Sequence, residues 1–564
     1  MHSTLFLILR RMRAPLIFLI VSYAVSILGL TLIPGVDADG RPAPPMGFFH
    51  AFYFISYTAT TIGFGEIPMA FSDAQRAWTT VAIYLTVIVW LYSIGTILGL
   101  LQEPALQRAI RANRFEARVR RLRQPFYLIA GCGETGVLLL QALDSRNQEV
   151  VVLDIDPERI NELELGQYRQ DVPALAADAR LPENLIAAGL HHPLCAGVIA
   201  LTNDDPVNLS VAVTTKLLRP ELPILCRADL LETAANMESF GVVDVVNAFE
   251  IFGEHLGIAI NNPGHHLLYQ WLTGVPGEPL AMPMEPPRGT WLVCGYGRFG
   301  QAVARHLDKQ GIELVVVDEH PPADHEHAVT GRGTEAHTLL EAGIEQAVGI
   351  VAGTHDDINN LSIAMTARQL KPGLFIVLRQ NRHANAALFE RFAAQTTMQP
   401  SSIVAHEFLS LLTTPLLPRF FSLALHQGDA WADVALSRIA AVVGDTVPEV
   451  WVRELSKTGT LAIWQALNED RAVRLGDLLR SPSDRNAQLA CVPLLLKRGN
   501  EEILVPDNEL PLMDGDRILF CGESQTRLQQ ALGLQDYSML DYLLTGNQAP
   551  GGLVWRKLAG HGKA

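Results

Sequence analysis

The 564-residue chain is poor in cysteine and in basic residues, and both shortages exclude classes of protein. No two of its six cysteines (132, 195, 226, 294, 491 and 521) form a Cys-x-x-Cys pair. This usage predicts neither a zinc site nor a disulfide framework, and it favours reduced thiols. Lysine and arginine number 44 against 59 acidic residues, and the resulting net charge of −15 argues against binding to nucleic acid. A chain of this length is too long to fold around a single hydrophobic core, and its length predicts about three or four domains.

Two long uncharged apolar runs lie near the N-terminus, at residues 14–33 and at about 77–101. Each is long enough to cross a bilayer as a helix. The length of the first run, and the presence of the second, argue against a cleaved signal peptide. Three arginines between residues 10 and 13 precede the first run, and seven between 108 and 123 follow the second. The positive-inside rule therefore predicts a multi-pass protein of the cell (inner) membrane, with both termini and everything after residue 101 in the cytoplasm.

A shorter apolar stretch, residues 46–60, leads into the segment Thr60-Thr61-Ile62-Gly63-Phe64-Gly65-Glu66. The stretch is too short to span, so we expect a re-entrant helix followed by non-helical backbone. Such backbone survives at membrane depth only inside protein or beside water, and two spans cannot enclose it, so several chains must share it. Gly63 and Gly65 permit a backbone whose carbonyls point one way, as cation coordination requires. An ordinary external turn is the alternative.

This segment resembles a potassium-channel selectivity filter, with Ile62 and Phe64 at the commonly varied valine and tyrosine positions. The resemblance implies a homotetramer in the lipid bilayer that conducts K+. It also implies that Glu66 stands at the outer mouth, where aspartate is more usual. No arginine-studded apolar helix is present in the sequence, so gating must come from the rest of the chain. The implied ion-coordinating residues are Thr61, Ile62, Gly63, Phe64 and Gly65.

A dinucleotide-binding pattern opens the remaining chain. A strand pattern at 126–130 runs into Gly131-Cys132-Gly133-Glu134-Thr135-Gly136 and a helical stretch, and the strand at 150–153 ends in Asp154. The glycines let backbone approach a pyrophosphate at a helix N-terminus, and the carboxylate accepts from ribose hydroxyls. In this context the motif predicts a site for NAD or an adenine nucleotide; an empty fold with a tight packing turn is the alternative. The candidate residues are Gly131, Cys132, Gly133, Glu134, Thr135, Gly136, Asp154, Ile155, Asp178, Ala179, Thr202 and Asn203.

The same pattern recurs from residue 291, which indicates two copies of one α/β fold. The copies differ where ligands matter, because Asp178 of the first is matched by Arg332 in the second. We predict that the two lobes do not bind the same ligand equally. Asp154 and Asp178 suit the ribose and adenine side of a nucleotide, whereas Arg298 and Arg332 can pair with phosphates. The second set of candidates is Gly295, Gly297, Arg298, Phe299, Gly300, Asp318 and Arg332.

A two-span pore followed by two such lobes resembles the prokaryotic multi-ligand-gated potassium channels with tandem RCK domains (regulators of potassium conductance). The predicted fold class is a membrane α-helical pore, then α/β with two Rossmann-like lobes and a small C-terminal α+β lobe. The resemblance implies a channel gated by an NAD- or ADP-type nucleotide rather than an enzyme. The rivals are a membrane-anchored NAD-dependent oxidoreductase and a nucleotide-binding subunit of a cation transporter. The expected boundaries are pore 1–106, linker 107–124, first RCK domain 125–249, helical connector 250–288, second RCK domain 289–415, C-terminal lobe 416–535 and tail 536–564.

The sequence offers two alternative sets of ligands for a divalent metal ion. Some members of the resembled family are activated by calcium, and the pairs Asp204-Asp205 and Asp356-Asp357 offer carboxylate oxygens. Histidines offer nitrogen ligands for a transition metal instead. No loop has the spacing of an EF-hand. The histidine-rich candidates are His320, His325, His327 and His355 in the second lobe, and His191 and His192 with Cys195 in the first.

Overall fold

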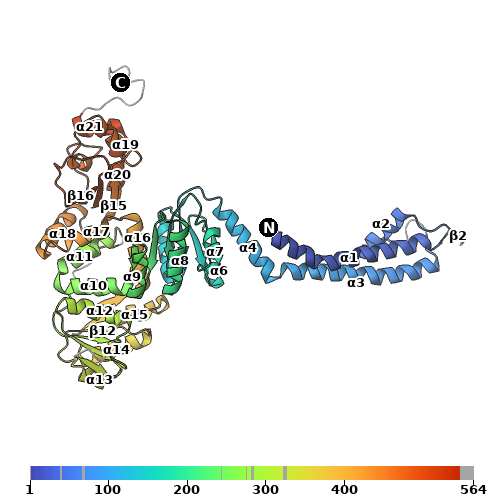
Figure 1. Ribbon diagram of the computed structural model, residues 1–564, viewed down its shortest axis with the longest axis horizontal. Helices are drawn as coiled ribbons and strands as arrows, with labels where there is room; N and C mark the ends of the chain where they lie inside the picture. Colours follow the sequence, from blue (N-terminus) through green and yellow to red (C-terminus); the bar gives the residue numbers. More distant parts are fainter. Residues whose placement is uncertain are drawn as a thin grey trace, which may run out of the picture. The chain divides into compact units, whose positions relative to one another are not determined.

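The computed structural model describes residues 2–37, 41–65, 70–242, 244–274, 276–280, 285–321 and 327–546. The chain divides into two units, Met1–Arg121 and Leu122–Ala564, and each is described by itself (Figure 1). Glu66, His325 and the tail beyond residue 546 lie outside the described residues.

Three apolar helices and the arginine-rich helix α4 form most of the first unit. Residues 12–32 of α1 and the whole of α3 have the length and hydropathy to cross a bilayer, as the sequence predicts. The predicted re-entrant stretch forms the 12-residue helix α2. A capping box starts α3, because Ser72 accepts from the backbone N–H of Gln75, whose side chain accepts from that of Ser72. The elements are α1 (His2–Leu32), β1 (Gly35–Val36), β2 (Pro42–Ala43), α2 (Phe48–Ala59), α3 (Asp73–Leu101) and α4 (Pro104–Val119).

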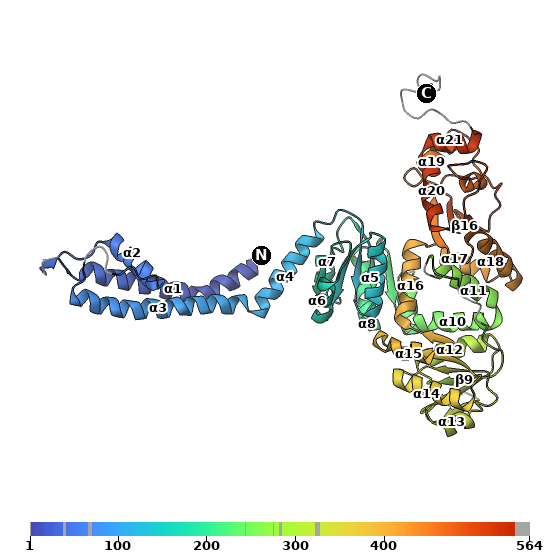
Figure 2. The same ribbon diagram turned by 180° about the vertical axis from the view of Figure 1, so that it is seen from behind.

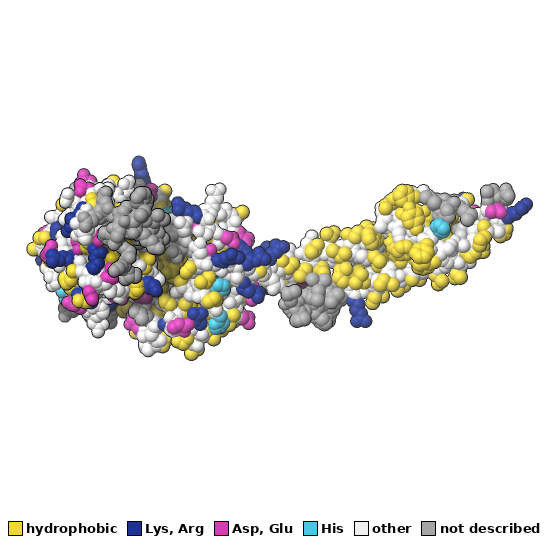
Figure 3. Space-filling model, turned by 90° about the horizontal axis from the view of Figure 1, so that it is seen from above, with side chains coloured by type: hydrophobic (Ala, Val, Ile, Leu, Met, Phe, Trp, Pro, Cys, Tyr) yellow, Lys and Arg dark blue, Asp and Glu magenta, His cyan; other side chains and the backbone are white. Residues whose placement is uncertain are grey.

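Helices α1 and α3 pack closely at Gly29, where an added Cβ would lie 2.0 Å from the ring of Trp78. The indole N–H of Trp78 donates to the carbonyl of Ser26 at 3.1 Å. Most other side chains of the two helices face outward, since only 28% and 17% of their apolar windows are buried. Figure 3 shows hydrophobic side chains over much of the visible face of this unit. Apolar surface on this scale requires lipid or further copies of the chain to cover it.

Two parallel six-stranded sheets form the lobes of the second unit. Their orders, β5-β4-β3-β6-β7-β8 and β11-β10-β9-β12-β13-β14, are identical, so the predicted duplication is confirmed. Strand order reverses beside β3 and β9, which is where doubly wound sheets bind ligands. The first lobe contains β3 (Phe126–Ala130), α5 (Glu134–Ser145), β4 (Glu149–Asp154), α6 (Pro157–Leu165), β5 (Ala174–Ala176), α7 (Pro182–Ala187), β6 (Cys195–Ala200), α8 (Asp205–Leu218), β7 (Ile224–Arg227), α9 (Leu231–Ser239) and β8 (Asp244–Val246).

The second lobe repeats this pattern, and its helices α12, α13 and α14 have the same lengths as α5, α7 and α8 of the first. It contains β9 (Trp291–Cys294), α12 (Arg298–Lys309), β10 (Leu314–Asp318), β11 (Ala328–Thr330), α13 (Ala336–Glu341), β12 (Gly349–Ala352), α14 (Asp357–Leu370), β13 (Phe375–Arg379), the 3-10 turn η1 (His383–Asn385), α15 (Ala386–Phe392) and β14 (Thr396–Met398). Buried valines, isoleucines and leucines fill the central strands of both sheets, as expected for parallel sheets covered on both faces.

Each lobe gives its last helix to the other. Helix α10 (Ala248–Asn261) follows β8 but packs on α12, and α16 (Pro400–Thr413) follows β14 but packs on α5 (Figure 2). At the first of these contacts Phe252 packs on Phe299, with ring centroids 5.6 Å apart. Glu250 of α10 pairs with Arg305 at 2.6 Å and with His306 at 3.0 Å. The predicted helical connector therefore joins the two lobes of one chain.

A small α+β lobe follows, with an antiparallel sheet in the order β15-β18-β16-β17. Helix α21 lies in the segment expected to be a tail and buries Leu540 and Leu543. The elements are α11 (Pro263–Thr273), α17 (Leu417–Ala424), α18 (Asp429–Val443), β15 (Glu449–Glu454), α19 (Leu461–Asn468), η2 (Leu475–Leu479), β16 (Cys491–Arg498), β17 (Glu501–Leu504), β18 (Arg517–Gly522), α20 (Ser524–Gln535) and α21 (Tyr537–Thr545).

His266 in α11 is expected to make the folded state less stable at acidic pH. Its side chain is buried, and neither ring nitrogen has a hydrogen-bond partner among the described residues. Burial lowers its pKa to about 4, whereas an unfolded histidine titrates near 6.5. The folded state therefore loses stability as pH falls from about 6.5 to about 4, by roughly 3 kcal/mol from this group. We expect His266→Leu to reduce the fall in the melting temperature of the full-length protein between pH 7 and 4.5.

The matched control is His426→Gln, because the side chain of His426 is exposed. That variant should keep the pH dependence of the unsubstituted protein. Equal acid sensitivity of His266→Leu and the unsubstituted protein would show that other groups control it.

Candidate functional site

The backbone after α2 has a positive φ at every second residue. The φ angles of Thr61, Gly63 and Gly65 are +64°, +66° and +91°, whereas Ile62 and Phe64 between them are not in the positive-φ region. In an ordinary strand, successive carbonyls point to opposite sides. Alternating the sign of φ turns successive carbonyls toward the same side. The positive-φ conformation that this requires is costly for a residue with a Cβ, whereas glycine adopts it freely. All five predicted filter residues lie in this one segment.

Tyr57 of α2 holds both ends of the segment. Its backbone carbonyl accepts from the N–H groups of Ile62 and Gly63 at 2.9 and 3.4 Å. Its hydroxyl donates to the carbonyl of Gly65 at 2.6 Å, and its ring meets the ring of Phe64 edge-on at 5.3 Å. The carboxyl end of α2, which carries a partial negative charge, lies next to the segment and favours a cation there. Ile62 and Phe64 are 60% and 59% exposed in the single chain, so one chain alone leaves the segment uncovered.

The first glycine turn of the second unit is tight because neighbouring backbone lies close to its glycines. Gly131 has φ +100°, and a Cβ there would lie 2.8 Å from the N atom of Thr202. A Cβ on Gly136 would lie 2.5 Å from the carbonyl oxygen of Gly131. Gly133 is the N-cap of α5 and makes no side-chain cap, so the first N–H groups of the helix are available to an anion such as a phosphate.

Asp154 supports this turn directly. Its carboxylate is 4% exposed and accepts from the N–H of Cys132 at 2.6 Å and from that of Asp156 at 2.9 Å. The predicted ribose acceptor is thus already bonded to the turn, and a ribose would have to share it. Arg159, which the sequence did not predict, lies 3.5 Å from the same carboxylate and is 45% exposed. Its only sequence signal is its position five residues after the acidic strand end.

The remaining candidates of the first lobe divide into accessible and buried groups. Asp178 lies at the surface in a bidentate pair with Arg180, whose hydrogen bonds lower the pKa of that carboxyl. Ile155 is 68% exposed, whereas Ala179 and Thr135 are buried. The other two candidates brace the loop after β6. The hydroxyl of Thr202 donates to Asn208, and the side-chain oxygen of Asn203 accepts from Arg227.

The second glycine turn repeats this geometry with different surroundings. Gly295 has φ +92°, and a Cβ on Gly300 would lie 2.0 Å from the carbonyl oxygen of Gly295. Asp318 accepts from the N–H of Tyr296 at 2.7 Å, as Asp154 does from that of Cys132. Gly297 caps α12 and has open space around it. Arg332, expected to meet a phosphate, pairs with Glu319 at 2.6 Å.

Phe299 corrects one sequence-based expectation. It stands inside the glycine motif, but its side chain is fully buried and packs on Phe249 and Phe252 of α10. A side chain in that position cannot contact a ligand at the turn. The motif residue is instead part of the core that joins the two lobes.

A cluster of arginines lies where the lobes meet. Arg227 makes a bidentate pair with Asp229 at 3.0 and 3.2 Å, and Arg298 approaches the same carboxylate at 3.5 Å. Arg379 stacks over the rings of Phe249 and Phe299 at 4.7 and 5.5 Å. Burial, followed by the charge of Arg298, lowers the pKa of Arg379 to about 10. Arg298, predicted to bind phosphate, is therefore directed at the first lobe from the turn of the second.

The described residues contain no group of three or more side chains arranged to hold a metal ion. Asp205 accepts from the backbone of Asp229 and Leu230, and Asp357 accepts from that of Asn381 and Arg382. One carboxylate of each predicted calcium pair is thus engaged in bracing the loop after the next strand. The six cysteines are free and buried, and burial raises the pKa of the Cys132 thiol to about 12.

Comparison with known proteins supports this division of the chain. The ion channel family matches residues 16–103, and the TrkA-N domain matches twice, at 127–248 and 291–400. Probable potassium channel protein 2 of Methanocaldococcus jannaschii is 26% identical over 249 residues, which cover 44% of this chain and 67% of that one. The voltage-gated potassium channel Kch of Escherichia coli is 25% identical over 224 residues, which cover 38% and 50%. Among solved structures, the GsuK channel bound to NAD is 18% identical, with a TM-score of 0.46, and the alignment covers 94% of this chain and all of that one.

The first unit is therefore an ion channel domain, and each six-stranded lobe is a TrkA-N domain, the domain also called RCK. The chain thus combines an ion channel domain with two TrkA-N domains, and the curated relatives that it matches include potassium channel proteins.

Proposed function

We propose that four copies of the chain form one K+-conducting pore, with Thr61 to Gly65 as the selectivity filter. The observation that carries this proposal is the alternation of φ over these residues at the end of a short apolar helix. Carbonyls directed to one side replace the hydration shell of a monovalent cation when several copies face each other. Assembly also covers the exposed Ile62 and Phe64 and the outward apolar faces of α1 and α3.

The RCK lobes then serve as the gate control, in the cytoplasm. The arginines of α4 and of the residues that follow it favour that side of the membrane. The first glycine turn offers free helix N–H groups, Arg159 and Asp178 to a nucleotide of the NAD or ADP type. Moving a gate from 1:99 to 99:1 needs roughly 5.5 kcal/mol of differential binding. Over four subunits this is about 1.4 kcal/mol each, a tenfold preference per site.

Flux measurements on purified protein in liposomes test the proposal. We expect K+ flux that exceeds Na+ flux and that changes when NAD or ADP is added on the cytoplasmic side. Absence of flux under each nucleotide, together with turnover of NADH, would favour the membrane-anchored oxidoreductase. Absence of flux with nucleotide binding retained would favour a regulatory subunit of a transporter.

Substitution of Arg298 is expected to weaken the coupling between nucleotide binding and channel opening without weakening nucleotide binding itself. Its guanidinium joins the second glycine turn to Asp229 of the first lobe, while Asp229 keeps its stronger pair with Arg227. Removal of this link should cost little stability, because its side chain is 53% exposed. We expect Arg298→Gln to reduce the nucleotide-induced change in open probability by at least about threefold, within the usual range of coupling free energies.

Single-channel recording measures that change, and calorimetry measures nucleotide affinity, which should stay within about twofold. Arg332→Gln is the matched control, because Arg332 pairs with Glu319 inside the same lobe. An equal defect in both variants would show that charge, rather than the contact between lobes, controls the response.

A further inference from the structure

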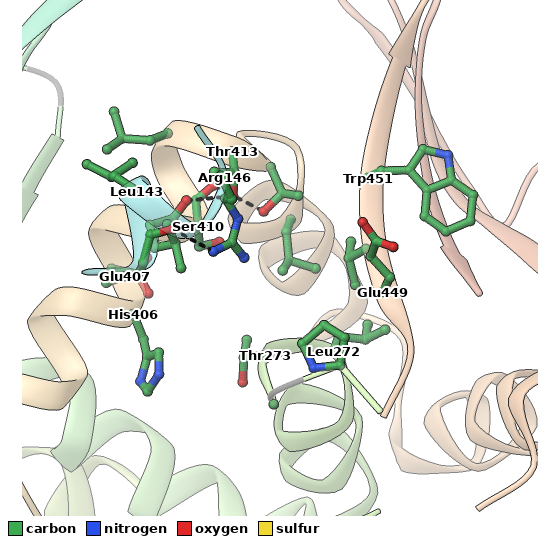
Figure 4. Close-up of a pocket in the computed structure, with 18 of the residues that line it drawn as sticks. Leu143, Arg146, Leu272, Thr273, His406, Glu407, Ser410, Thr413, Glu449 and Trp451 are labelled. Atoms are coloured by element: carbon green, nitrogen blue, oxygen red, sulfur yellow. Dashed lines mark hydrogen bonds between the residues drawn. The ribbon is translucent and has the colours of Figure 1, made fainter. Parts of the chain in front are cut away.

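The second unit contains a cavity of about 880 Å³ that touches neither glycine turn. It lies between α5 of the first lobe, helices α11 and α16, and strand β15 of the C-terminal lobe (Figure 4). Helix α5 reaches it at Arg146, at the opposite end from the turn at Gly133. Its volume lies within the range of small-molecule sites, and its lining combines apolar walls with converging polar groups.

Three arginines line this cavity, and two of them lack an acidic partner. Arg527 pairs with Glu449 at 2.6 Å. Arg453 donates to the side-chain oxygen of Gln530 at 3.2 Å and to the carbonyl of Arg527 at 2.6 Å. Arg146 donates to the carbonyl of Ala142 at 3.1 Å. Among the described residues, the guanidinium groups of Arg146 and Arg453 therefore meet only neutral acceptors.

The acidic groups of the lining do not balance these charges. Glu449 already pairs with Arg527, and the pKa of Glu407 is raised by burial and by the charges of Glu254 and Asp244. Burial, together with the charge of Arg527, lowers the pKa of Arg146 and of Arg453, and the charge of Glu449 offsets this only in part, so each charge is disfavoured in its present surroundings. An anion in the cavity would reverse that effect, because an opposite charge at short range favours the ionised arginine.

The remaining walls suit the apolar and uncharged parts of a ligand. Leu143, Leu272 and Leu409 supply apolar surface, and Ser410 supplies a hydroxyl. Strand β15 is the edge of its sheet and pairs with β18 on one side only, so its outer backbone N–H and C=O groups are open to hydrogen bonding. Figure 4 shows Arg146 and Glu449 on opposite sides of the space, reached from α5 and β15.

We propose that this cavity is a second ligand site of the cytoplasmic unit, for a small amphiphilic anion with one carboxylate or phosphate group. The anionic group lies between Arg146 and Arg453, and the apolar body lies along the leucines of α5, α11 and α16. A bound ligand joins the first RCK lobe to the C-terminal lobe through these two arginines. The site is independent of the nucleotide turns and of the ion that the pore conducts.

Calorimetry on the full-length protein in detergent, with saturating NAD present, tests the site. The probes are 4-phenylbutyrate and phenyl phosphate, with the neutral 4-phenylbutyramide as their uncharged counterpart. We expect saturable binding of at least one anion at one site per chain, and binding of the amide at least about tenfold weaker. The carboxylate and phosphate probes show which of the two head groups the site prefers.

Arg146→Gln should weaken binding of the anion at least about tenfold, because it removes a charge-assisted hydrogen bond. Ser410→Trp fills the cavity and should abolish binding of the anion. If that variant does not fold, the smaller substitution Ser410→Leu should still weaken binding. Arg438→Gln is the matched control, because Arg438 is exposed on α18 outside the lining. The proposal is overturned by failure of both anions to bind, by equal binding of the amide, or by equal effects of Arg146→Gln and Arg438→Gln.

Discussion

Potassium flux through Gly63→Ala is expected to fall by at least about a hundredfold. The φ angle of Gly63 is +66°, and no atom of the described residues lies within 4 Å of an added Cβ, so conformation rather than space is the constraint. A residue with a Cβ in the left-handed region costs roughly 1–2 kcal/mol. Four copies around one pore would add about 4–8 kcal/mol to the conducting state, which the segment relieves by turning carbonyls away from the ion path. Flux of K+ into liposomes measures the loss.

Gly47→Ala is the matched control for this prediction. Gly47 precedes α2 with φ −65°, and an added Cβ there also meets nothing within 4 Å. Its flux and its K+ preference over Na+ should stay close to those of the unsubstituted protein. Normal K+ flux through Gly63→Ala would place the ion path outside this segment and would remove the basis of the proposed filter.

Nucleotide binding is expected to weaken at least about tenfold in Asp154→Asn. The carboxylate accepts from two backbone N–H groups, one of them in the glycine turn. An amide offers a single acceptor oxygen and turns an N–H group toward a donor, which leaves a buried group unsatisfied at a cost of about 1–3 kcal/mol. The turn then loses the shape that presents the N-terminus of α5. Calorimetry with NAD and ADP measures the affinity.

Asp318→Asn makes the same change in the second lobe, where the carboxylate accepts from Tyr296 and His320. A larger loss in Asp154→Asn than in Asp318→Asn is expected if the first lobe holds the nucleotide. The reverse order would move the site to the second lobe. If both substitutions had equally small effects, the nucleotide would bind away from both glycine turns.

The sequence predicted those parts of the fold that depend on local pattern. The apolar lengths of α1 and α3, the short helix before Thr61 and the strands that lead into both glycine motifs follow from periodicity and composition. The duplication was visible because it repeats glycines, strand-end aspartates and asparagines at fixed spacing. Local signals of this kind survive without knowledge of tertiary contacts.

Tertiary contacts account for what the sequence could not show. The sequence around Phe299 does not show whether this residue contacts a ligand or lies in the core. Its burial depends on α10, which belongs to the other lobe in sequence. Asp154 bonds to its own turn because the strand end and the turn meet only in the folded sheet. The cavity beside Arg146 combines residues from five separate stretches of the chain. No short stretch of sequence contains enough of it to predict a site.

The exchange of α10 and α16 makes the two RCK lobes resemble an obligate dimer on one polypeptide. A chain cut at Gly277, between the lobes, would leave each fragment holding a helix that completes the core of the other. We expect the fragments to copurify and each to aggregate when expressed alone, because each would expose the apolar surface that the missing helix covers. The duplication therefore did not produce two separable modules. Later sequence changes in one lobe remained constrained by the surface of the other.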